Sequence, residues 1–214
     1  MLFRAVIFSL ILFFFAGCIY EAEPMPQVMA DRAGAVMSQQ ARAKPANSAG
    51  IGKSFPKGWL PPAKLEHKWT AIIIHHSGTA TGNAAIFDKW HREDNHWEGV
   101  GYDFVIGNGT DSGEGKVEVT FRWRYQMAGA HCGGTKGNWA NKYAVGICLV
   151  GDFDEGRPSR RQAQSLVRLV RFLQGRYGIA TSRIYGHNTT PGARVTNCPG
   201  QSFSIAKFRA MLGN

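Results

Sequence analysis

Two histidines and one cysteine, far apart along the chain, have side chains that could together bind a metal ion. His75 ends a run of isoleucines, His187 follows a short apolar segment, and Cys198 lies shortly after it. Zinc binds imidazole nitrogen and thiolate sulfur readily, and a catalytic zinc site keeps three protein ligands and one open position. With this donor set, Zn²⁺ would keep a net charge of about +1 and lower the pKa of a bound water towards about 7.

The spacing of these three residues does not by itself establish a metal site. The sequence contains neither an HExxH motif nor a CxxC pair, which are short signatures typical of zinc sites. On spacing alone, the alternative is a core histidine at position 75, a surface histidine at position 187 and a buried thiol at position 198.

The segments around these residues have the patterns of strands. Three consecutive isoleucines within 69–76 favour a strand buried on both faces. Segments 102–106, 117–121 and 143–150 also read as strands, separated in part by Gly- and Asp-rich turns. The sequence therefore predicts a sheet that positions the candidate ligands.

Helical spacing of apolar residues predicts helices over 83–92, 159–177 and 204–212. The longest of them is expected to begin after Ser159, a plausible N-cap, and to stop at Gly178. Strands mixed with helices predict the α/β class, with a central sheet covered by helices.

The N-terminus has the layout of an export signal. In residues 1–18, one arginine precedes an apolar run of about 18 Å as a helix, which is too short for a bilayer core of about 30 Å. The end of this segment resembles a bacterial lipobox, which predicts lipidation of Cys18. Ordinary signal cleavage and a short anchor or buried helix are the alternatives. Residues 19–55 are expected to be a flexible tether, and 56–214 the folded domain.

Composition and charge narrow the class of partner. Apolar residues make up 44% of the chain and charged residues 19%, which is globular composition. The net charge of +10 favours polyanionic surroundings such as nucleic acid, anionic lipid or an acidic wall polymer. Export argues against nucleic acid. In an oxidising compartment Cys132 and Cys148 could pair, although their spacing does not show the required geometry.

Five short segments, taken in order, resemble one known family. They are Trp69-Thr-Ala-Ile-Ile-Ile-His-His-Ser-Gly-Thr79, Gly99-Val-Gly-Tyr-Asp-Phe-Val-Ile106, Gly129-Ala-His131, Val145-Gly-Ile-Cys-Leu-Val-Gly-Asp-Phe153, and Gly186-His187 with Asn197-Cys-Pro-Gly200. Together they resemble the zinc-dependent N-acetylmuramoyl-L-alanine amidases of the type-2 amidase and peptidoglycan recognition protein superfamily. The resemblance covers about 69–212 and implies a single domain with a central mixed β-sheet, flanking helices and a zinc groove at one face.

The resemblance also implies roles for individual residues. His75, His187 and Cys198 match the Zn²⁺ ligands of the family. Tyr102 matches its active-site tyrosine, whose hydroxyl could donate to an oxyanion or orient water, and Thr196 could donate from the other side. Without the family, Tyr102 reads as a half-buried strand tyrosine and Thr196 as a turn residue. No Glu stands out as a general base.

Other residues in or near the matching segments are candidates for supporting roles. Asp103 replaces a histidine common in the family, and its neighbouring position in a strand predicts that it points away from the site. His76 and His131 are candidates for substrate binding, with packing or a structural role as the alternative. Three further histidines (67, 91 and 96) are expected at the surface. Segment 122–125 alternates basic and aromatic residues, as in a groove wall or a solvated strand face.

The predicted function is hydrolysis of the amide between N-acetylmuramic acid and the L-alanine of peptidoglycan, with Zn²⁺ as cofactor. The alternative is a non-catalytic peptidoglycan-binding module of the same fold. Expected partners are peptidoglycan or muropeptides, and a membrane through a lipid anchor at Cys18, with no nucleic acid. The predicted location is the cell envelope, facing the periplasm or wall.

Overall fold

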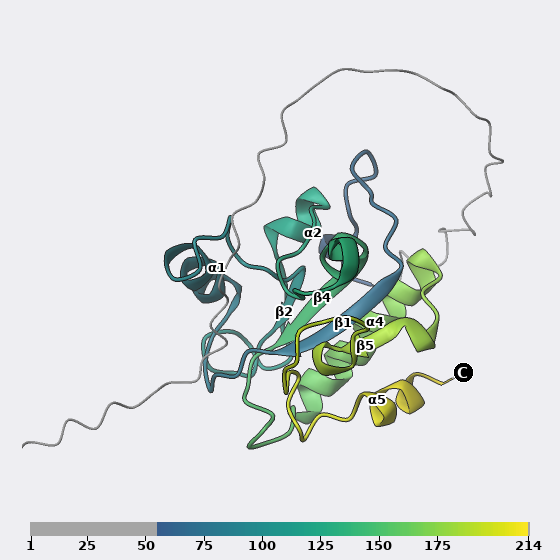
Figure 1. Ribbon diagram of the computed structural model, residues 1–214. Helices are drawn as coiled ribbons and strands as arrows, with labels where there is room; N and C mark the ends of the chain where they lie inside the picture. The colour runs from purple at the N-terminus through teal and green to yellow at the C-terminus, as the bar shows by residue number, and fades with distance from the viewer. Residues whose placement is uncertain (1–54, 214) are drawn as a thin grey trace, which may run out of the picture.

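The computed structural model of the protein describes residues 55–213 and contains one five-stranded sheet (Figure 1). The strands lie in the order β3-β2-β4-β1-β5. Strand β1 is parallel to β4 and to β5, and β2 is parallel to β4 but antiparallel to β3. The sheet is therefore mixed, as expected. The strands are β1 Ala71–His76, β2 Phe104–Ile106, β3 Val117–Val119, β4 Ala144–Leu149 and β5 Ile184–Gly186.

Helices flank this sheet on both faces. They are α1 Ala84–Glu93, α2 Phe121–Tyr125, α3 Trp139–Tyr143, α4 Arg160–Tyr177 and α5 Ile205–Leu212, with short 3₁₀ turns η1 Lys57–Trp59, η2 Lys136–Asn138, η3 Thr181–Arg183 and η4 His187–Thr189. Buried side chains of α4 and α5 pack on the face that carries Ile72, Ile74 and Ile147. The opposite face carries Ile73 and Cys148 and packs on α3 and α1.

The two central strands are buried along their whole length, apart from the last residue of β1. Strands covered on both faces have no polar side to keep in water, which is why their sequences are nearly continuous apolar runs. The isoleucine run of β1 predicts such a strand, and the structure confirms it. Because β1 and β4 run parallel in register, residues that follow either strand emerge at the same edge of the sheet.

Helix α4 has the termini that the sequence predicted. The hydroxyl of Ser159 accepts the backbone N–H of Gln162, and the Gln162 side chain accepts the backbone N–H of Ser159. This reciprocal pair is a capping box, which satisfies N–H groups that have no partner within the helix. At the other end Gly178 has φ +68, a left-handed conformation that glycine adopts without steric cost.

The predicted strand 117–121 is only partly correct. Strand β3 ends at Val119, and the chain then turns into the short helix α2. The cause is tertiary packing: the indole of Trp123 is fully buried against Phe104 and Trp69, and its N–H donates to the carbonyl of Trp59. The alternating segment 122–125 is therefore helical, and half of it belongs to the core.

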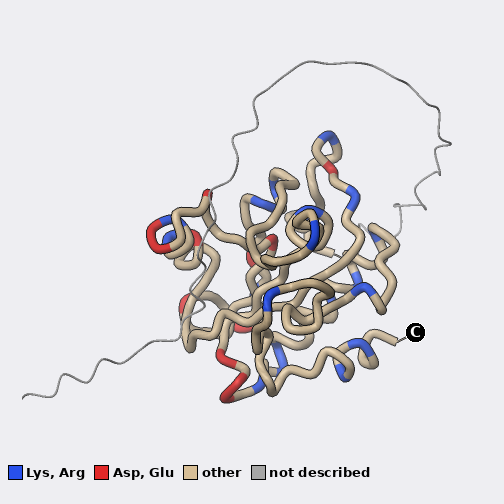
Figure 2. The backbone as a smooth tube through the Cα atoms, in the orientation of Figure 1, with Lys and Arg blue, Asp and Glu red and all other residues tan. Residues whose placement is uncertain are grey.

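Charged residues are distributed over several elements. Figure 2 shows Lys and Arg on helices and connecting loops, including α5 near the C-terminus, whereas Asp and Glu lie on α1 and in loops. Helices α2 and α4 contain basic but no acidic residues. None of the helices in the described part of the chain combines the length and apolar character that a membrane span requires. The predicted export signal, the lipidation site at Cys18 and the tether up to residue 54 lie outside the described residues.

Candidate metal centre

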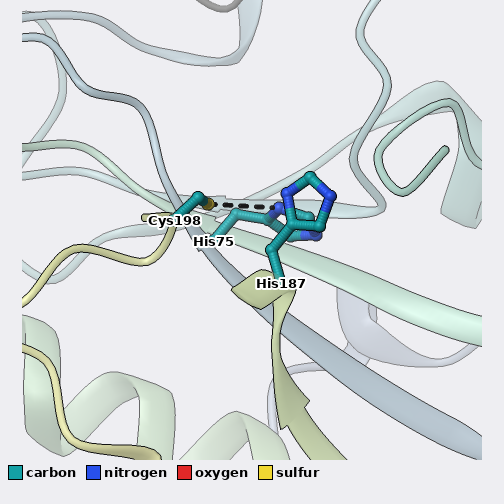
Figure 3. Close-up of side chains that lie close together, drawn as sticks. All are labelled: His75, His187 and Cys198. Carbon is teal, nitrogen blue, oxygen red and sulfur yellow. Dashed lines mark hydrogen bonds between the residues drawn. The ribbon is translucent and has the colours of Figure 1, made fainter. Parts of the chain in front are cut away.

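The three candidate ligands come together at one edge of the sheet. His75 is the penultimate residue of β1, His187 directly follows β5, and Cys198 lies in the loop after η4. One donor atom from each lies within 4.8 Å of the others (Figure 3). All three residues are buried. The parallel pairing of β1 with β5 is what brings the two histidines together, since parallel strands end at the same edge.

The geometry of the cluster fits zinc. The Nδ1 of His75 lies 3.5 Å from the Sγ of Cys198. Tetrahedral coordination with Zn–N of about 2.0 Å and Zn–S of about 2.3 Å places two such donors about 3.5 Å apart. The Nε2 of His187 is buried without a hydrogen-bond partner.

The environment keeps these imidazoles neutral. Burial, followed by the neighbouring His187, holds the pKa of His75 well below its ordinary value. Burial, with a smaller effect of His76, lowers the pKa of His187 to about 4. A metal ion binds the unprotonated imidazole nitrogen. At neutral pH both rings therefore have a lone pair for a cation without first losing a proton.

The loop that carries Cys198 is held by backbone contacts. The carbonyl of Cys198 accepts the N–H of Asn188 at 2.7 Å, and the hydroxyl of Thr196 accepts the N–H of Cys198 at 3.2 Å. Thr196, predicted to be catalytic, therefore lies beside the cysteine and restrains its backbone. These two hydrogen bonds fix the backbone of Cys198 and thereby the position of its thiol.

Tyr102, the other predicted catalytic residue, lies against the first ligand. Its ring centroid is 5.2 Å from that of His75, and its backbone carbonyl accepts the Thr120 hydroxyl at 2.7 Å. The residue is half-buried, and its side chain packs on the cluster that contains Cys148. In the register of β1 and β4, Cys148 is directly opposite His75. The structure thus places the Tyr102 ring against His75, the first of the three candidate ligands.

The two histidines proposed for substrate contact have different surroundings. The Nδ1 of His76 accepts the N–H of Phe153 at 3.1 Å, and its ring packs on the Phe153 ring. His131 is only 4% exposed, and its Nδ1 lies 3.1 Å from the Nε2 of His75. Burial, with a smaller effect of His187, lowers the pKa of His131 to about 3. His131 therefore contacts a candidate ligand directly.

The sequence interpretation underestimated Asp103. Its side chain is fully buried, and Oδ2 accepts the N–H of Gly146 at 2.8 Å, while Oδ1 has no hydrogen-bond partner. Burial raises the pKa of Asp103 to about 7. The backbone N–H of Asp103 in turn donates to the carbonyl of Gly146. Together these two hydrogen bonds join the residue before β2 to strand β4. The signal in the sequence for this buried carboxyl was an aspartate directly before the apolar residues Phe104–Ile106.

His91 also differs from the expectation of a surface histidine. Its Nδ1 accepts the N–H of Gly101 at 3.0 Å, and its ring lies 5.8 Å from that of Tyr102. Burial lowers the pKa of His91 to about 4. His67 is also partly buried, through contacts with Trp69, whereas His96 is exposed as expected.

The other two cysteines in the described range 55–213 are free thiols. Cys132 and Cys148, whose spacing would permit a bond, form no disulfide and belong to different buried clusters. Burial raises the pKa of Cys132 to about 11 and that of Cys148 well above its ordinary value. Both groups are therefore inert thiols at neutral pH rather than thiolates.

A hollow of about 550 Å³ lies between α1 and α2. Its wall includes Thr120, whose hydroxyl donates to the backbone carbonyl of Tyr102. Asp88 and Arg92 form an ion pair on its wall, and Phe121 and Tyr125 add aromatic surface. The remaining lining residues are Ala84, Ala85 and Val100.

Comparison with known proteins places this geometry in a family. The family model Amidase_2, described as N-acetylmuramoyl-L-alanine amidase, matches residues 65–201. A peptidoglycan recognition protein of Trichoplusia ni is 26% identical over 141 residues, which cover 59% of this chain and 70% of the relative.

Solved structures show the same fold. The N-acetylmuramoyl-L-alanine amidase LysC of Clostridium intestinale has a TM-score of 0.57 at 27% identity, covering 68% of this chain and 85% of LysC. PGRP-SA of Apis mellifera has a TM-score of 0.53 at 21% identity, covering 65% and 81% of the two chains, and supports the fold alone. The matched range includes all three metal-ligand candidates, and the chain belongs to the N-acetylmuramoyl-L-alanine amidase family, within the type-2 amidase and peptidoglycan recognition protein superfamily.

Proposed function

We propose that the protein is a zinc amidase that hydrolyses the bond between N-acetylmuramic acid and L-alanine in peptidoglycan. One observation carries the proposal: two imidazoles and a thiol, from residues far apart in sequence, place their donor atoms within 4.8 Å of one another. His75, His187 and Cys198 would hold the ion. When bound, Zn²⁺ would polarise the amide carbonyl and activate water at neutral pH.

The chain's own residues would orient and stabilise the reacting groups. Tyr102 lies beside His75, where its hydroxyl would donate a hydrogen bond to the oxygen that gains negative charge during hydrolysis. Thr196 accepts the N–H of Cys198 and thereby keeps the thiol directed at the histidines. Its hydroxyl proton is then available to a substrate oxygen from the other side of the site.

A non-catalytic binding module is the competing function. The name of the Trichoplusia ni relative, a peptidoglycan recognition protein, favours it. An intact set of metal ligands favours the enzyme, because recognition of a wall polymer does not require an open Lewis-acid site.

A release assay separates the two functions. Purified peptidoglycan is incubated with the full chain, with and without a chelator, and free stem peptides beginning with L-alanine are measured. We expect release that the chelator abolishes and added Zn²⁺ restores. Binding to the wall without release of stem peptides would favour the recognition module instead.

We further propose that the protein is exported and anchored to a membrane through lipidated Cys18, so that it acts in the cell envelope. The support is the order of residues 1–18 and the tether-like composition of 19–55. A tether between lipid and domain would let the site reach a nearby polymer.

A further inference from the structure

We propose that His131 is a positioning residue that fixes the tautomer of His75, so that Nδ1 of His75 faces the metal without a proton. The proposal rests on the proposed function in one respect, since it takes the cluster as a zinc site. Its basis is that His75 has two different neighbours: Nδ1 lies 3.5 Å from Sγ of Cys198, and Nε2 lies 3.1 Å from Nδ1 of His131.

The far end of this chain of hydrogen bonds sets its direction. The Nε2 of His131 lies 3.3 Å from the backbone carbonyl oxygen of Ala144, which can only accept. That nitrogen therefore carries the proton of a neutral His131, and its Nδ1 is an acceptor. His75 must then donate from Nε2, which leaves its Nδ1 with a free lone pair directed at Cys198.

The ring of His131 is held in a slot built from two glycines. A Cβ atom on Gly129 would lie 2.3 Å from Cδ2 of His131, and one on Gly146 would lie 2.5 Å from the same atom. Any side chain at either position would displace the ring. The backbone on both sides therefore sets the plane of the imidazole, which a flexible side-chain contact would not do.

Asn141 holds the backbone that carries this ring. Its Oδ1 accepts the N–H groups of both His131 and Cys132 at 2.9 Å, and its Nδ2 donates to Oδ1 of Asn138. With so little of His131 exposed, direct contact with a wall polymer is a poor explanation for these restraints. The restraints are explained if His131 is the hydrogen-bond partner of a metal ligand, His75, because such partners orient metal-binding imidazoles and raise their basicity.

Zinc affinity tests the proposal. The full-length protein and the variants His131→Ala and His131→Asn are titrated with Zn²⁺ against a chromophoric chelator. Loss of the acceptor is expected to weaken binding about 10- to 100-fold in His131→Ala. His131→Asn is expected to recover part of the affinity, because its Oδ1 branches from the same carbon as Nδ1 of histidine. Equal affinity in His131→Ala and the wild type would overturn the proposal.

A matched control removes a histidine elsewhere. His96→Asn replaces an exposed histidine with φ +55 by a residue that tolerates this conformation, and it should bind zinc as the wild type does. The Co²⁺-substituted proteins give an independent reading. Their visible spectrum should change in His131→Ala and recover in His131→Asn, whereas a loss of general stability would leave the coordination spectrum of the folded fraction unchanged.

The wild-type protein supplies a test that does not depend on a variant folding. Long-range ¹H–¹⁵N spectra of the metal-free protein should show His75 as the Nε2–H tautomer, and the Nδ1–H tautomer would overturn the proposal. Failure of the proposed function looks different: the wild type would bind zinc with the expected dependence on His131 and leave peptidoglycan intact. A wild type that binds no zinc would refute both proposals.

Discussion

The Nδ1 of His75 and the Sγ of Cys198 lie 3.5 Å apart although 123 positions separate the two residues in sequence. His75 is fixed in the parallel strand β1, and Cys198 is fixed by a loop whose backbone is tied to Asn188 and Thr196. Neither side chain reaches the other by local folding. The pair therefore exists only when the whole sheet and the C-terminal loop have formed.

Replacing this cysteine tests the candidate metal site. Cys198→Ala removes one of three donors, and we expect bound zinc to fall from one equivalent to a small fraction and hydrolysis to fall at least about 100-fold. Metal analysis and the release assay measure the two quantities, and some binding to the wall should persist. Cys132→Ala is the control, because this buried thiol lies outside the cluster. Unchanged turnover in Cys198→Ala would refute the site.

Tyr102→Phe isolates the contribution of one hydroxyl. The ring remains against His75, so zinc content should not change. We expect kcat to fall about 10²- to 10³-fold with little change in KM, the pattern of a donor that acts on charge developing in the transition state. Tyr143→Phe removes the hydroxyl of an exposed tyrosine and should leave both constants unchanged. A wild-type kcat in Tyr102→Phe would remove Tyr102 from the mechanism.

Asp103 should make stability depend on pH. Its pKa rises from 3.8 to about 7 on folding, so between these values the folded protein holds a proton that the unfolded chain has lost. The contribution of the protonated Asp103 carboxyl to the free energy of unfolding is complete below pH 4 and is lost as the pH rises through about 7. Asp103→Asn does not titrate, and its stability relative to the wild type should increase by up to about 4 kcal/mol between pH 4 and pH 8. Urea unfolding at several pH values measures this difference, and parallel curves would contradict it.

Ser159→Ala tests the predicted start of α4 apart from the site. Loss of the hydroxyl leaves the N–H of Gln162 without its cap, which costs about 1 kcal/mol. We expect a lower Tm by a few degrees and unchanged zinc affinity, measured by thermal unfolding and metal titration. Ser182→Ala, in the turn η3, is the comparison substitution, and an equal loss in both variants would argue against a capping contribution.

Lipidation of Cys18 is tested in a bacterial host. Cells that express the full chain are labelled with a fatty acid, and we expect label in the wild type and none in Cys18→Ala. The Cys18→Ala protein, without its lipid anchor, should then appear in the soluble fraction, whereas the wild type should stay with the membranes. Label that persists in Cys18→Ala would contradict the lipidation site.

The sequence alone determined the elements with strong local signals. The isoleucines of β1, the apolar spacing of α4 and its two caps are local patterns, because burial and capping act within a few residues of the positions that show them. The ordered blocks also identified the family and its candidate ligands, and the family match confirms the family.

Only the tertiary structure decided how these residues meet. Parallel pairing of β1 with β5 brings His75 and His187 to one edge, and no local pattern specifies which strands pair. The ring of Tyr102, which precedes β2, meets His75 through packing between strands. Trp123 overrode the strand pattern of its segment because burying an indole in the core favours the helix α2. The contact between His131 and His75, and the burial of Asp103, likewise depend on long-range packing, so position along the chain could not reveal them.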